Sequence, residues 1–211
     1  MKFEKLLSLV GNQPLFETGL LLAGEMNPDD VRRQLSRWVR SGRIRKLRRG
    51  LYTLAPPYQS VVPHPFVIAN ALVPGSYVST QSALAFYGFI PEYTPRTMSV
   101  TTGRPSSWEG GFQFQHLALH LFYGYQLANL SDGQQAFVAT PEKALLDLAH
   151  LTPRSDSTNY LVELRLQNLD RLDLPRLYGF AQQSGKPKWQ RVASQIESLA
   201  LQEKGEYQEF V

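Results

Sequence analysis

The stretch Asn27–Leu54 decides the fold of the N-terminal part, and it reads NPDDVRRQLSRWVRSGRIRKLRRGLYTL. From Val31 onward it holds no acid and nine bases: Arg32, Arg33, Arg37, Arg40, Arg43, Arg45, Lys46, Arg48 and Arg49. A solvated helix face normally mixes charges of both signs. A run of one sign therefore indicates an anionic partner.

The first half of this stretch predicts a helix that runs to about Ser41. Asn27-Pro28-Asp-Asp30 is a strong helix start, because asparagine caps, proline suits the first helical position, and acids complement the positive end of the helix dipole. Gly42 is a typical C-terminal stop. Helical spacing places the apolar residues on one face: Val31, Leu35, Trp38 and Val39.

The neighbouring segments complete a compact N-terminal module. Apolar spacing predicts helices over Phe3–Val10 and over Phe16–Leu22, the second ending near Ala23-Gly24. Two short apolar-containing runs, Arg43–Leu47 and Leu51–Leu54, flank a glycine turn and predict a β-hairpin. The order helix, helix, helix, hairpin in residues 1–54 is that of a winged helix-turn-helix.

This order assigns the bases to two parts of a DNA-binding surface. A recognition helix places side chains in the major groove, and a wing meets phosphate or the minor groove. We expect the following residues to face the major groove: Arg32, Arg33, Gln34, Ser36, Arg37 and Arg40. We expect the following to serve the wing and its phosphate contacts: Arg45, Lys46, Arg48 and Arg49. A solvated amphipathic face is the plainer alternative, and RNA is the alternative nucleic acid.

A proline-punctuated linker over residues 55–65 predicts that a second domain begins at residue 66. Within it the pattern predicts strands at 97–101, 112–117 and 136–139, with helices at 66–72, 80–87, 140–150, 158–168, 174–184 and 187–203. Ser79 or Thr80 is expected to cap the second of these helices, and Thr140 the third. We therefore expect an α+β protein, in which residues 66–211 form a mixed domain with a small sheet and a helical C-terminal part.

The charge of the chain is concentrated in one place. Its 211 residues carry a net charge of +4. Residues 27–50 hold nine bases and two acids, a net +7, and the remaining 13 bases and 16 acids give −3. There is no cysteine, no apolar run long enough to span a bilayer, and no signal-peptide core in Met1–Val10. We expect a cytoplasmic protein with no membrane partner.

Residues that could support catalysis do not form a recognisable set. His116 and His120 share the spacing of metal ligands, but no third ligand is nearby, so we expect two ordinary histidines on a half-buried strand. Many metal-dependent nucleases present Asp and Glu-x-Lys at a strand edge. Neither Glu-x-Lys nor Asp-x-Lys occurs here, and the nearest match is Glu163-Leu-Arg165. Asp147 is expected to be a surface or hydrogen-bonding residue. We therefore expect no enzymatic activity, no cofactor and no metal.

Two motifs have an ordinary explanation that we prefer. Thr140-Pro-Glu-Lys could bind phosphate at a helix start, but plain N-capping accounts for it. The aromatic turns Tyr87–Pro91 and Phe122–Tyr125 could form an interaction surface, but we expect core packing there.

Three motifs together resemble the AbiEi antitoxins of bacterial abortive-infection toxin–antitoxin systems. They are RIRKLRRGLY at Arg43–Tyr52, STQSALAFYGFIP at Ser79–Pro91, and ATPEKALLD at Ala139–Asp147. The resemblance runs in order from about residue 3 to about residue 150.

The resemblance implies a transcriptional autorepressor whose winged helix-turn-helix binds inverted repeats in double-stranded promoter DNA. It also implies that residues 66–211 are an antitoxin domain opposing a nucleotidyltransferase toxin, AbiEii, in the type IV manner and without an obligatory stable complex. The family's DNA-contact roles fall on the arginines of the predicted third helix and wing. Two alternatives from other classes stay open: an effector-sensing transcription factor with a ligand-binding C-terminal domain, and a DNA-processing enzyme.

Overall fold

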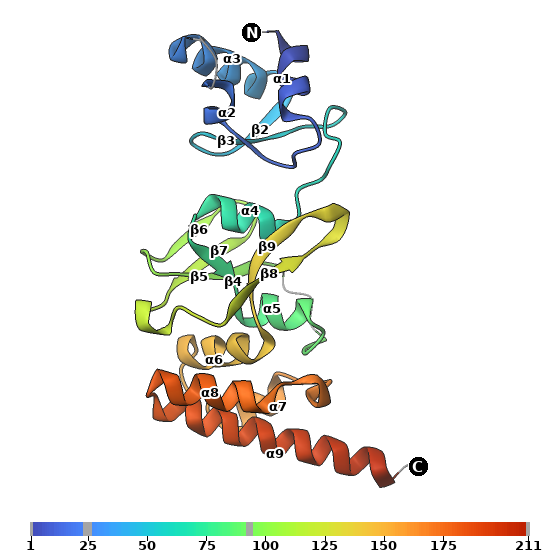
Figure 1. The fold of residues 1–211 in the computed structure, drawn as a ribbon, viewed down its shortest axis with the longest axis vertical. Helices are drawn as coiled ribbons and strands as arrows, with labels where there is room; N and C mark the ends of the chain where they lie inside the picture. The colour runs from blue at the N-terminus through green and yellow to red at the C-terminus, as the bar shows by residue number, and fades with distance from the viewer. Residues whose placement is uncertain (1, 23–26, 92–94, 210–211) are drawn as a thin grey trace. The chain divides into compact units, whose positions relative to one another are not determined.

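A computed structural model describes residues 2–22, 27–91 and 95–209 and shows a mixed α+β protein of two compact units (Figure 1). The first unit comprises residues 1–74 with 129–134, and the second comprises 75–128 with 135–211. The first unit is therefore larger than the predicted 1–54 domain, because it includes a helix after the proline-rich segment and the 129–134 turn.

The first unit has the predicted winged helix-turn-helix order, with one additional strand. In chain order its elements are α1 (Phe3–Val10), β1 (Phe16–Glu17), α2 (Thr18–Leu22), α3 (Pro28–Arg40), β2 (Ile44–Arg48), β3 (Leu51–Leu54) and α4 (Pro65–Leu72). The 129–134 segment adds a short 3-10 turn, η2 (Ser131–Gly133). The strands form one antiparallel sheet in the order β1-β3-β2.

The predicted helix over Phe16–Leu22 is wrong in its first two residues. Phe16 and Glu17 form β1 instead, paired with Tyr52 and Leu51 of β3. The reason is tertiary: Phe16 is buried, and its ring stacks on Tyr52 with centroids 5.7 Å apart. The spacing of nearby apolar residues carries no information about a partner strand 36 residues further along the chain. Ala23-Gly24, the predicted end of that helix, lies outside the described residues.

An apolar core holds the first unit together around α3. Val31, Leu35 and Trp38 are buried, and Val39 packs against them as predicted. The other core positions come from α1, α2 and the three strands: Phe3, Leu6, Val10, Phe16, Leu21, Ile44, Tyr52 and Leu54. Burying one face of α3 in this way leaves its opposite face to solvent.

The second unit is built on a six-stranded mixed sheet in the order β6-β7-β5-β4-β9-β8. The strands are β4 (Ser76–Val78), β5 (Thr97–Thr101), β6 (Ser106–Trp108), β7 (Phe112–His116), β8 (Tyr125–Asn129) and β9 (Gln135–Ala139). The predicted strands are confirmed as β5, β7 and β9. The other three were not predicted, because β4 is three wholly buried residues and neither β6 nor β8 alternates apolar and polar residues.

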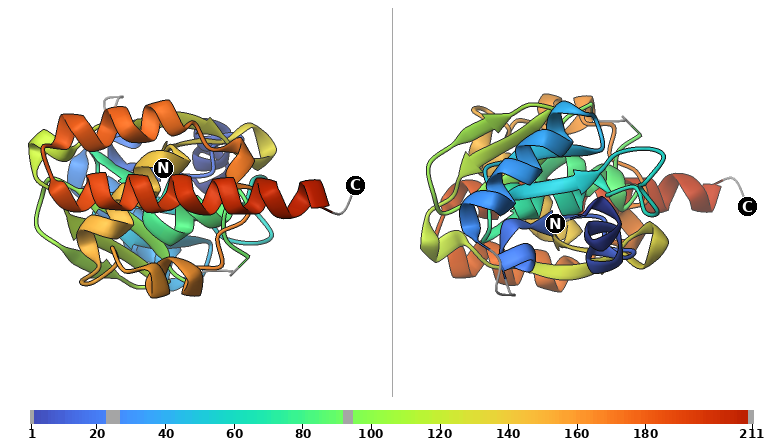
Figure 2. Two further views of the ribbon diagram at one scale, coloured as in Figure 1. Left: turned by 90° about the horizontal axis from the view of Figure 1, so that it is seen from below. Right: turned by 90° about the horizontal axis from the view of Figure 1, so that it is seen from above.

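Helices cover the sheet of the second unit in two layers (Figures 1 and 2). In chain order they are α5 (Thr80–Phe86), α6 (Pro141–Leu151), α7 (Thr158–Glu163), α8 (Leu174–Ser184) and α9 (Pro187–Glu209), with short 3-10 turns η1 (Leu119–Leu121) and η3 (Leu169–Arg171). The contacts of α6 reach α5 and β9 on one side and α8 and α9 on the other, and α8 lies beside α9.

The predicted helix over 158–168 is too long. It ends at Glu163, and Arg165 and Asn168 adopt the left-handed conformation with φ of 51° and 59°. Contacts distant in sequence hold this segment, because the Gln167 amide donates to the Phe89 carbonyl and the Asn168 side chain donates to that of Gly88. The predicted helix over 187–203 continues to Glu209.

Candidate nucleic-acid interface

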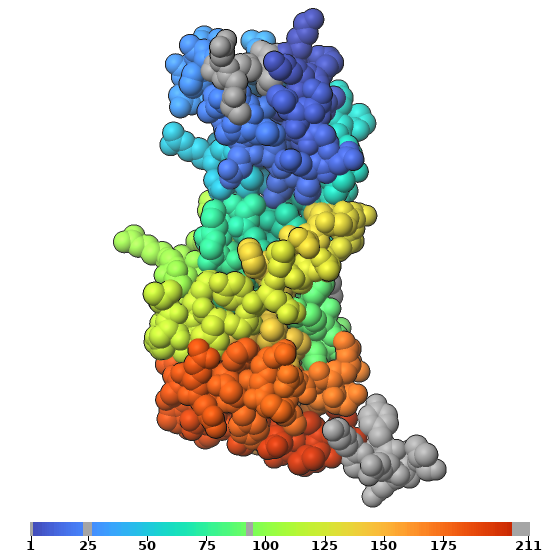
Figure 3. Space-filling view, in the orientation of Figure 1, coloured from blue at the N-terminus to red at the C-terminus, as the bar shows by residue number. Residues whose placement is uncertain are grey.

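The predicted recognition helix, α3, begins where the capping residues require. The Asn27 side chain accepts a hydrogen bond of 2.9 Å from the Asp29 amide, and proline occupies the first turn. With the apolar face buried, four of the predicted arginines and a serine are exposed: Arg32, Arg33, Ser36, Arg37 and Arg40. Gln34 is half-buried. Capping and core packing thus leave one polar face of α3 exposed. Figure 3 shows the residues of α3, in blue, at the surface of the first unit.

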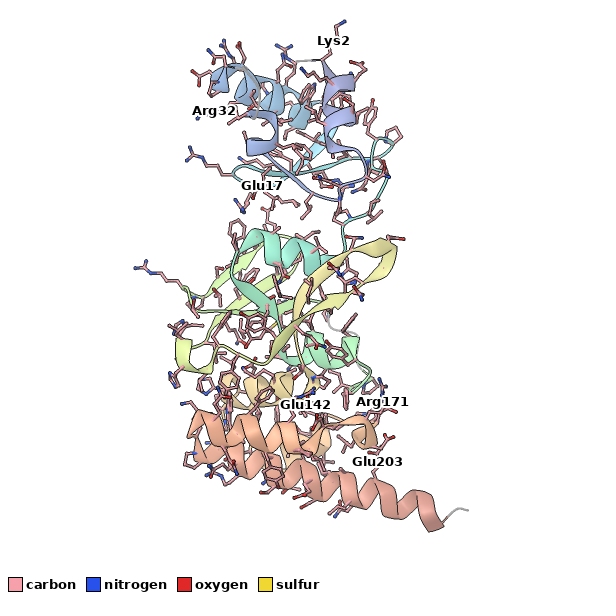
Figure 4. All side chains as sticks on the ribbon, viewed as in Figure 1. Lys2, Glu17, Arg32, Glu142, Arg171 and Glu203 are labelled. Atoms are coloured by element: carbon pink, nitrogen blue, oxygen red, sulfur yellow. The ribbon has the colours of Figure 1, made fainter. Side chains whose placement is uncertain are left out.

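These five exposed residues line a shallow open hollow of about 450 Å³. Arg32 points outward from α3 (Figure 4). The structure therefore gathers five of the six predicted helix residues on one surface, with Gln34 outside that lining. A convex helix face with guanidinium groups around a shallow hollow has the composition expected for contact with a groove edge or a phosphate.

Two of the four arginines on this face are paired with acids of their own helix. Arg32 pairs with Asp29 at 2.9 Å, and Arg33 pairs with Asp30 at 3.0 Å. The side chains of the first pair have exposed fractions of 67% and 72%. An exposed pair of this kind stabilises a protein by at most about 1 kcal/mol, so a phosphate or a base can replace the aspartate.

Five other cations of the predicted contact set have no ion pair within the part of the first unit that the structure describes. They are Arg37 and Arg40 on α3, and Arg45, Lys46 and Arg49 in the hairpin. All five are exposed. Charges that are solvated and unmatched in the free protein lose little when they bind a phosphate, and they release condensed counterions from DNA.

Arg48 differs from its neighbours, although we predicted it as part of the wing's phosphate contacts. Its side chain is only 24% exposed and pairs with Glu17 at 3.1 Å. It also donates to the carbonyls of Ala71 and Arg49, at 3.0 and 3.2 Å. Arg48 is therefore largely buried and bonded within the first unit, unlike the exposed cations beside it.

Arg43 was not included in the predicted contact set, although it belongs to the same basic run. It is exposed, and its guanidinium carbon lies 5.0 Å from the centroid of the Phe3 ring. A cation over an aromatic face is stabilised by the ring's quadrupole. Nothing in the local sequence around residue 43 indicates that contact, because Phe3 lies 40 positions earlier.

The second unit holds a contrasting polar cluster, the buried cluster, made of Tyr77, Ser79, Lys143 and Asp147. All four residues are buried. Tyr77 and Ser79 donate to Asp147 Oδ2 at 3.0 and 2.7 Å, and the Lys143 ammonium donates to Asp147 Oδ1 and to the Tyr77 hydroxyl. Asp147 was expected to be a surface or hydrogen-bonding residue; it is hydrogen-bonded and fully enclosed.

Burial dominates the acid–base properties of this cluster. It raises the pKa of Asp147 and lowers the pKa of Lys143, while each charge opposes the shift of the other. Burial also raises the pKa of the Tyr77 hydroxyl, and the neighbouring Asp147 raises it further. The side chains of Lys143 and Asp147 have no exposed surface, so neither reaches a substrate in this structure. What the geometry supports is a fixed attachment of α6 to β4.

The buried cluster also changes the interpretation of the sequence motifs. Ser79 occupies the N-cap position of α5, but its hydroxyl donates to Asp147 and makes no cap bond. Thr140 caps α6 as predicted, accepting from the Lys143 amide. In the aromatic turns, core packing is confirmed for Phe89 and Ile90, which are buried.

The two histidines of metal-like spacing do not share a strand, so that expectation is wrong. His116 ends β7, whereas His120 lies in η1, and both are exposed. The chain leaves the sheet after Leu117, whose amide still donates to the Thr101 carbonyl of β5, and the 3-10 turn η1 follows. Among the described residues, no group of three or more His, Cys, Asp or Glu side chains is placed to hold a metal ion.

Comparison with solved structures gives a likeness in fold. The chain is similar to the crystal structure of the RV2827C protein from Mycobacterium tuberculosis, with a TM-score of 0.57 and 17% sequence identity over 92% of this chain and 76% of that one. At that identity the likeness concerns the fold alone. No protein-family model matches the chain, and no curated protein matches it significantly. None of the helices that the structure describes is both long and apolar enough to cross a membrane.

Proposed function

We propose that this protein is a DNA-binding transcriptional autorepressor that also acts, in the cytoplasm, as the antitoxin of a bacterial toxin–antitoxin system. The DNA-binding half is supported by one observation above all. Five exposed cations of α3 and the hairpin, Arg37, Arg40, Arg45, Lys46 and Arg49, lack an ion pair among the described residues of the first unit. Double-stranded DNA is the partner that suits such a surface on this arrangement of elements.

The proposed mode of binding places α3 in the major groove. The exposed arginines of α3 read base edges, since a guanidinium forks onto the O6 and N7 atoms of guanine. The hairpin lies against the phosphate backbone, where Arg45, Lys46 and Arg49 position the protein and contribute affinity without reading sequence. Repression follows if the bound site overlaps the protein's own promoter.

Binding to DNA is tested with the full chain on promoter and random duplexes between about 50 and 200 mM salt. About six phosphate contacts give a log–log slope near −5, at roughly −0.9 for each contact. Binding that does not depend on salt, or no binding to either duplex, would contradict the DNA-binding half. Tighter binding to a structured RNA than to either duplex would shift the proposal to RNA.

The antitoxin half rests on the resemblance to AbiEi proteins. Its motifs at 79–91 and 139–147 belong to the second unit, where Ser79, Lys143 and Asp147 join the buried cluster. This supports a second unit that shares the family's internal framework, with the toxin-opposing surface elsewhere on it. The proposed partner is a nucleotidyltransferase toxin, opposed without catalysis by this chain and without an obligatory stable complex.

Rescue of growth must be separated from repression, so the toxin gene is driven from a foreign promoter. The full chain is then expected to rescue growth, and so is the Arg37→Ala, Arg49→Ala double variant, because DNA binding no longer matters. Deleting the residues after Pro74 should abolish rescue. Rescue that survives this deletion, or that is lost in a folded double variant, leaves a repressor without an antitoxin role.

A further inference from the structure

Arg48 uses every nitrogen of its guanidinium group inside the first unit. Nε donates to the Ala71 carbonyl at 3.0 Å, Nη1 donates to the Arg49 carbonyl at 3.2 Å, and Nη2 pairs with Glu17 Oε1 at 3.1 Å. Glu17 is labelled in Figure 4 beside the hairpin. Three of its five N–H donors are thus used within the first unit, and its side chain is only 24% exposed, so Arg48 presents less of its guanidinium to a phosphate than its exposed neighbours do.

The position of Ala71 near the end of α4 favours a hydrogen bond from a cation to its carbonyl group. Ala71 lies in the last turn of the helix, where carbonyl groups have no partner within the helix and carry partial negative charge. The last turn of α4 contains no basic residue of its own. Arg48 therefore supplies from the hairpin the cation that the end of α4 lacks.

The backbone turns Arg48 towards these partners. The pairing of β2 with β3 shifts register between Lys46 and Arg48, and such a bulge re-aims the side chain that follows it. The other side of the hairpin turn is also held, since the Thr18 amide donates to the Gly50 carbonyl at 2.9 Å. The turn that carries Arg49 is thus attached to β1, to the start of α2 and to α4.

We propose that Arg48 is a positioning residue of the DNA interface and not one of its phosphate contacts. It fixes the hairpin on α4 and β1, and this sets the direction in which Lys46 and Arg49 meet the DNA backbone. The inference rests on the proposed DNA-binding function and changes the role first predicted for Arg48. It also assigns a role to Glu17, whose negative charge would otherwise only oppose DNA binding.

Two substitutions in the full chain distinguish positioning from direct contact. Arg48→Lys keeps the positive charge but loses the three-way fork, so a positioning role predicts affinity for random duplex roughly fivefold weaker, as for Arg48→Ala. Glu17→Gln removes an acid near the DNA, yet it should also weaken binding, by roughly threefold. Direct contact predicts near-normal affinity for Arg48→Lys and tighter binding for Glu17→Gln.

A third arm tests whether Arg48 acts through its neighbours. In a Lys46→Ala, Arg49→Ala background, Arg48→Lys should change affinity by less than about twofold, because the side chains that it directs are absent. Arg191→Lys is the matched control, since it alters an arginine–aspartate pair of 2.7 Å in the second unit and should leave DNA affinity unchanged. Circular dichroism and melting curves establish that each variant is folded at the assay temperature. If the Arg48 variants unfold, Glu17→Gln still tests the proposal, because the Glu17 side chain is 64% exposed.

The outcomes separate the two proposals. Weakening by both Arg48→Lys and Glu17→Gln supports positioning. Three results would overturn the positioning role without affecting the proposed DNA binding. They are wild-type affinity for Arg48→Lys, tighter binding for Glu17→Gln, and an undiminished effect of Arg48→Lys in the double-alanine background. Absence of salt-dependent binding by the wild-type chain overturns the proposed function, and this inference with it.

Discussion

The two units place their charged residues in opposite ways. In the first unit an apolar core leaves the arginines of α3 in solvent, where two of them have only weak partners and two have no ion pair among the described residues. In the second unit Lys143 and Asp147 lie inside the core, matched to each other and to two hydroxyl groups. An exposed charge is available to a ligand, whereas a buried charge must be satisfied internally, so burial separates the candidate interface from a structural cluster.

The largest expected effect comes from breaking the buried cluster. Lys143→Met should destabilise the protein by about 3–5 kcal/mol, because it leaves the Asp147 carboxylate enclosed without a cation. Denaturant unfolding measures this change. Arg32→Gln, which breaks the exposed pair with Asp29, is the control and should change stability by less than about 1 kcal/mol. Equal effects from both variants would remove the distinction between the two kinds of charge.

The next effect distinguishes the proposed base contacts of α3 from the proposed phosphate contacts of the hairpin. Arg37→Ala should lose about 1–3 kcal/mol of discrimination between operator and random DNA, as expected when a forked base contact is removed. Arg49→Ala should weaken both duplexes alike and reduce the magnitude of the salt slope by about 0.9, the share of one phosphate contact. Fluorescence anisotropy titrations over a salt series measure both quantities. A larger change in sequence preference from Arg49→Ala would reverse the assigned roles.

A smaller effect should follow from removing the cap of α3. Asn27→Ala deletes the acceptor for the Asp29 amide and should destabilise the first unit by about 1 kcal/mol, with a matching loss of DNA affinity at temperatures near its melting point. Thermal melts followed by circular dichroism measure the loss. Asn27→Ser restores a capping oxygen and should recover most of the stability; an equal loss in both variants would exclude capping as the cause.

The smallest expected effect is a dependence on pH through His64. Its Nδ1 accepts the Phe66 amide at the start of α4, and burial lowers the pKa of His64 below its usual 6.5. The unfolded chain therefore binds a proton more readily than the folded chain, so stability falls as the pH drops through 6.5 towards the folded pKa. The loss should not exceed about 1 kcal/mol, the usual contribution of a cap.

His64→Asn provides the control for this pH effect, because asparagine caps without titrating. Burial also lowers the pKa of His150, so part of the acid sensitivity should remain in that variant. The measurement is the difference in unfolding free energy between wild type and His64→Asn from about pH 7.5 to 5. A difference that does not change with pH would show that the cap is not the titrating contact.

Local sequence determined those features that depend on neighbouring residues. The bounds of α3 follow from the Asn27 cap, the proline after it and Gly42, and its outward face follows from the 3.6-residue period of Val31, Leu35 and Trp38. The hairpin follows from two short strands around a glycine turn. From these the α+β class and the winged order of the first unit were predicted correctly, and the exposed face of α3 lies where the helical period placed it.

Tertiary structure alone decided the features that depend on partners far along the chain. The strand at Phe16 needs Tyr52, the role of Arg48 needs Glu17 and Ala71, and the buried cluster joins Tyr77 to Asp147 across 70 positions. Helical period and capping act over about four residues, so they carry no information about such pairs. The chain's own sequence therefore determined which charges α3 presents, while three-dimensional packing determined which basic residues stay exposed and which are used to hold the fold.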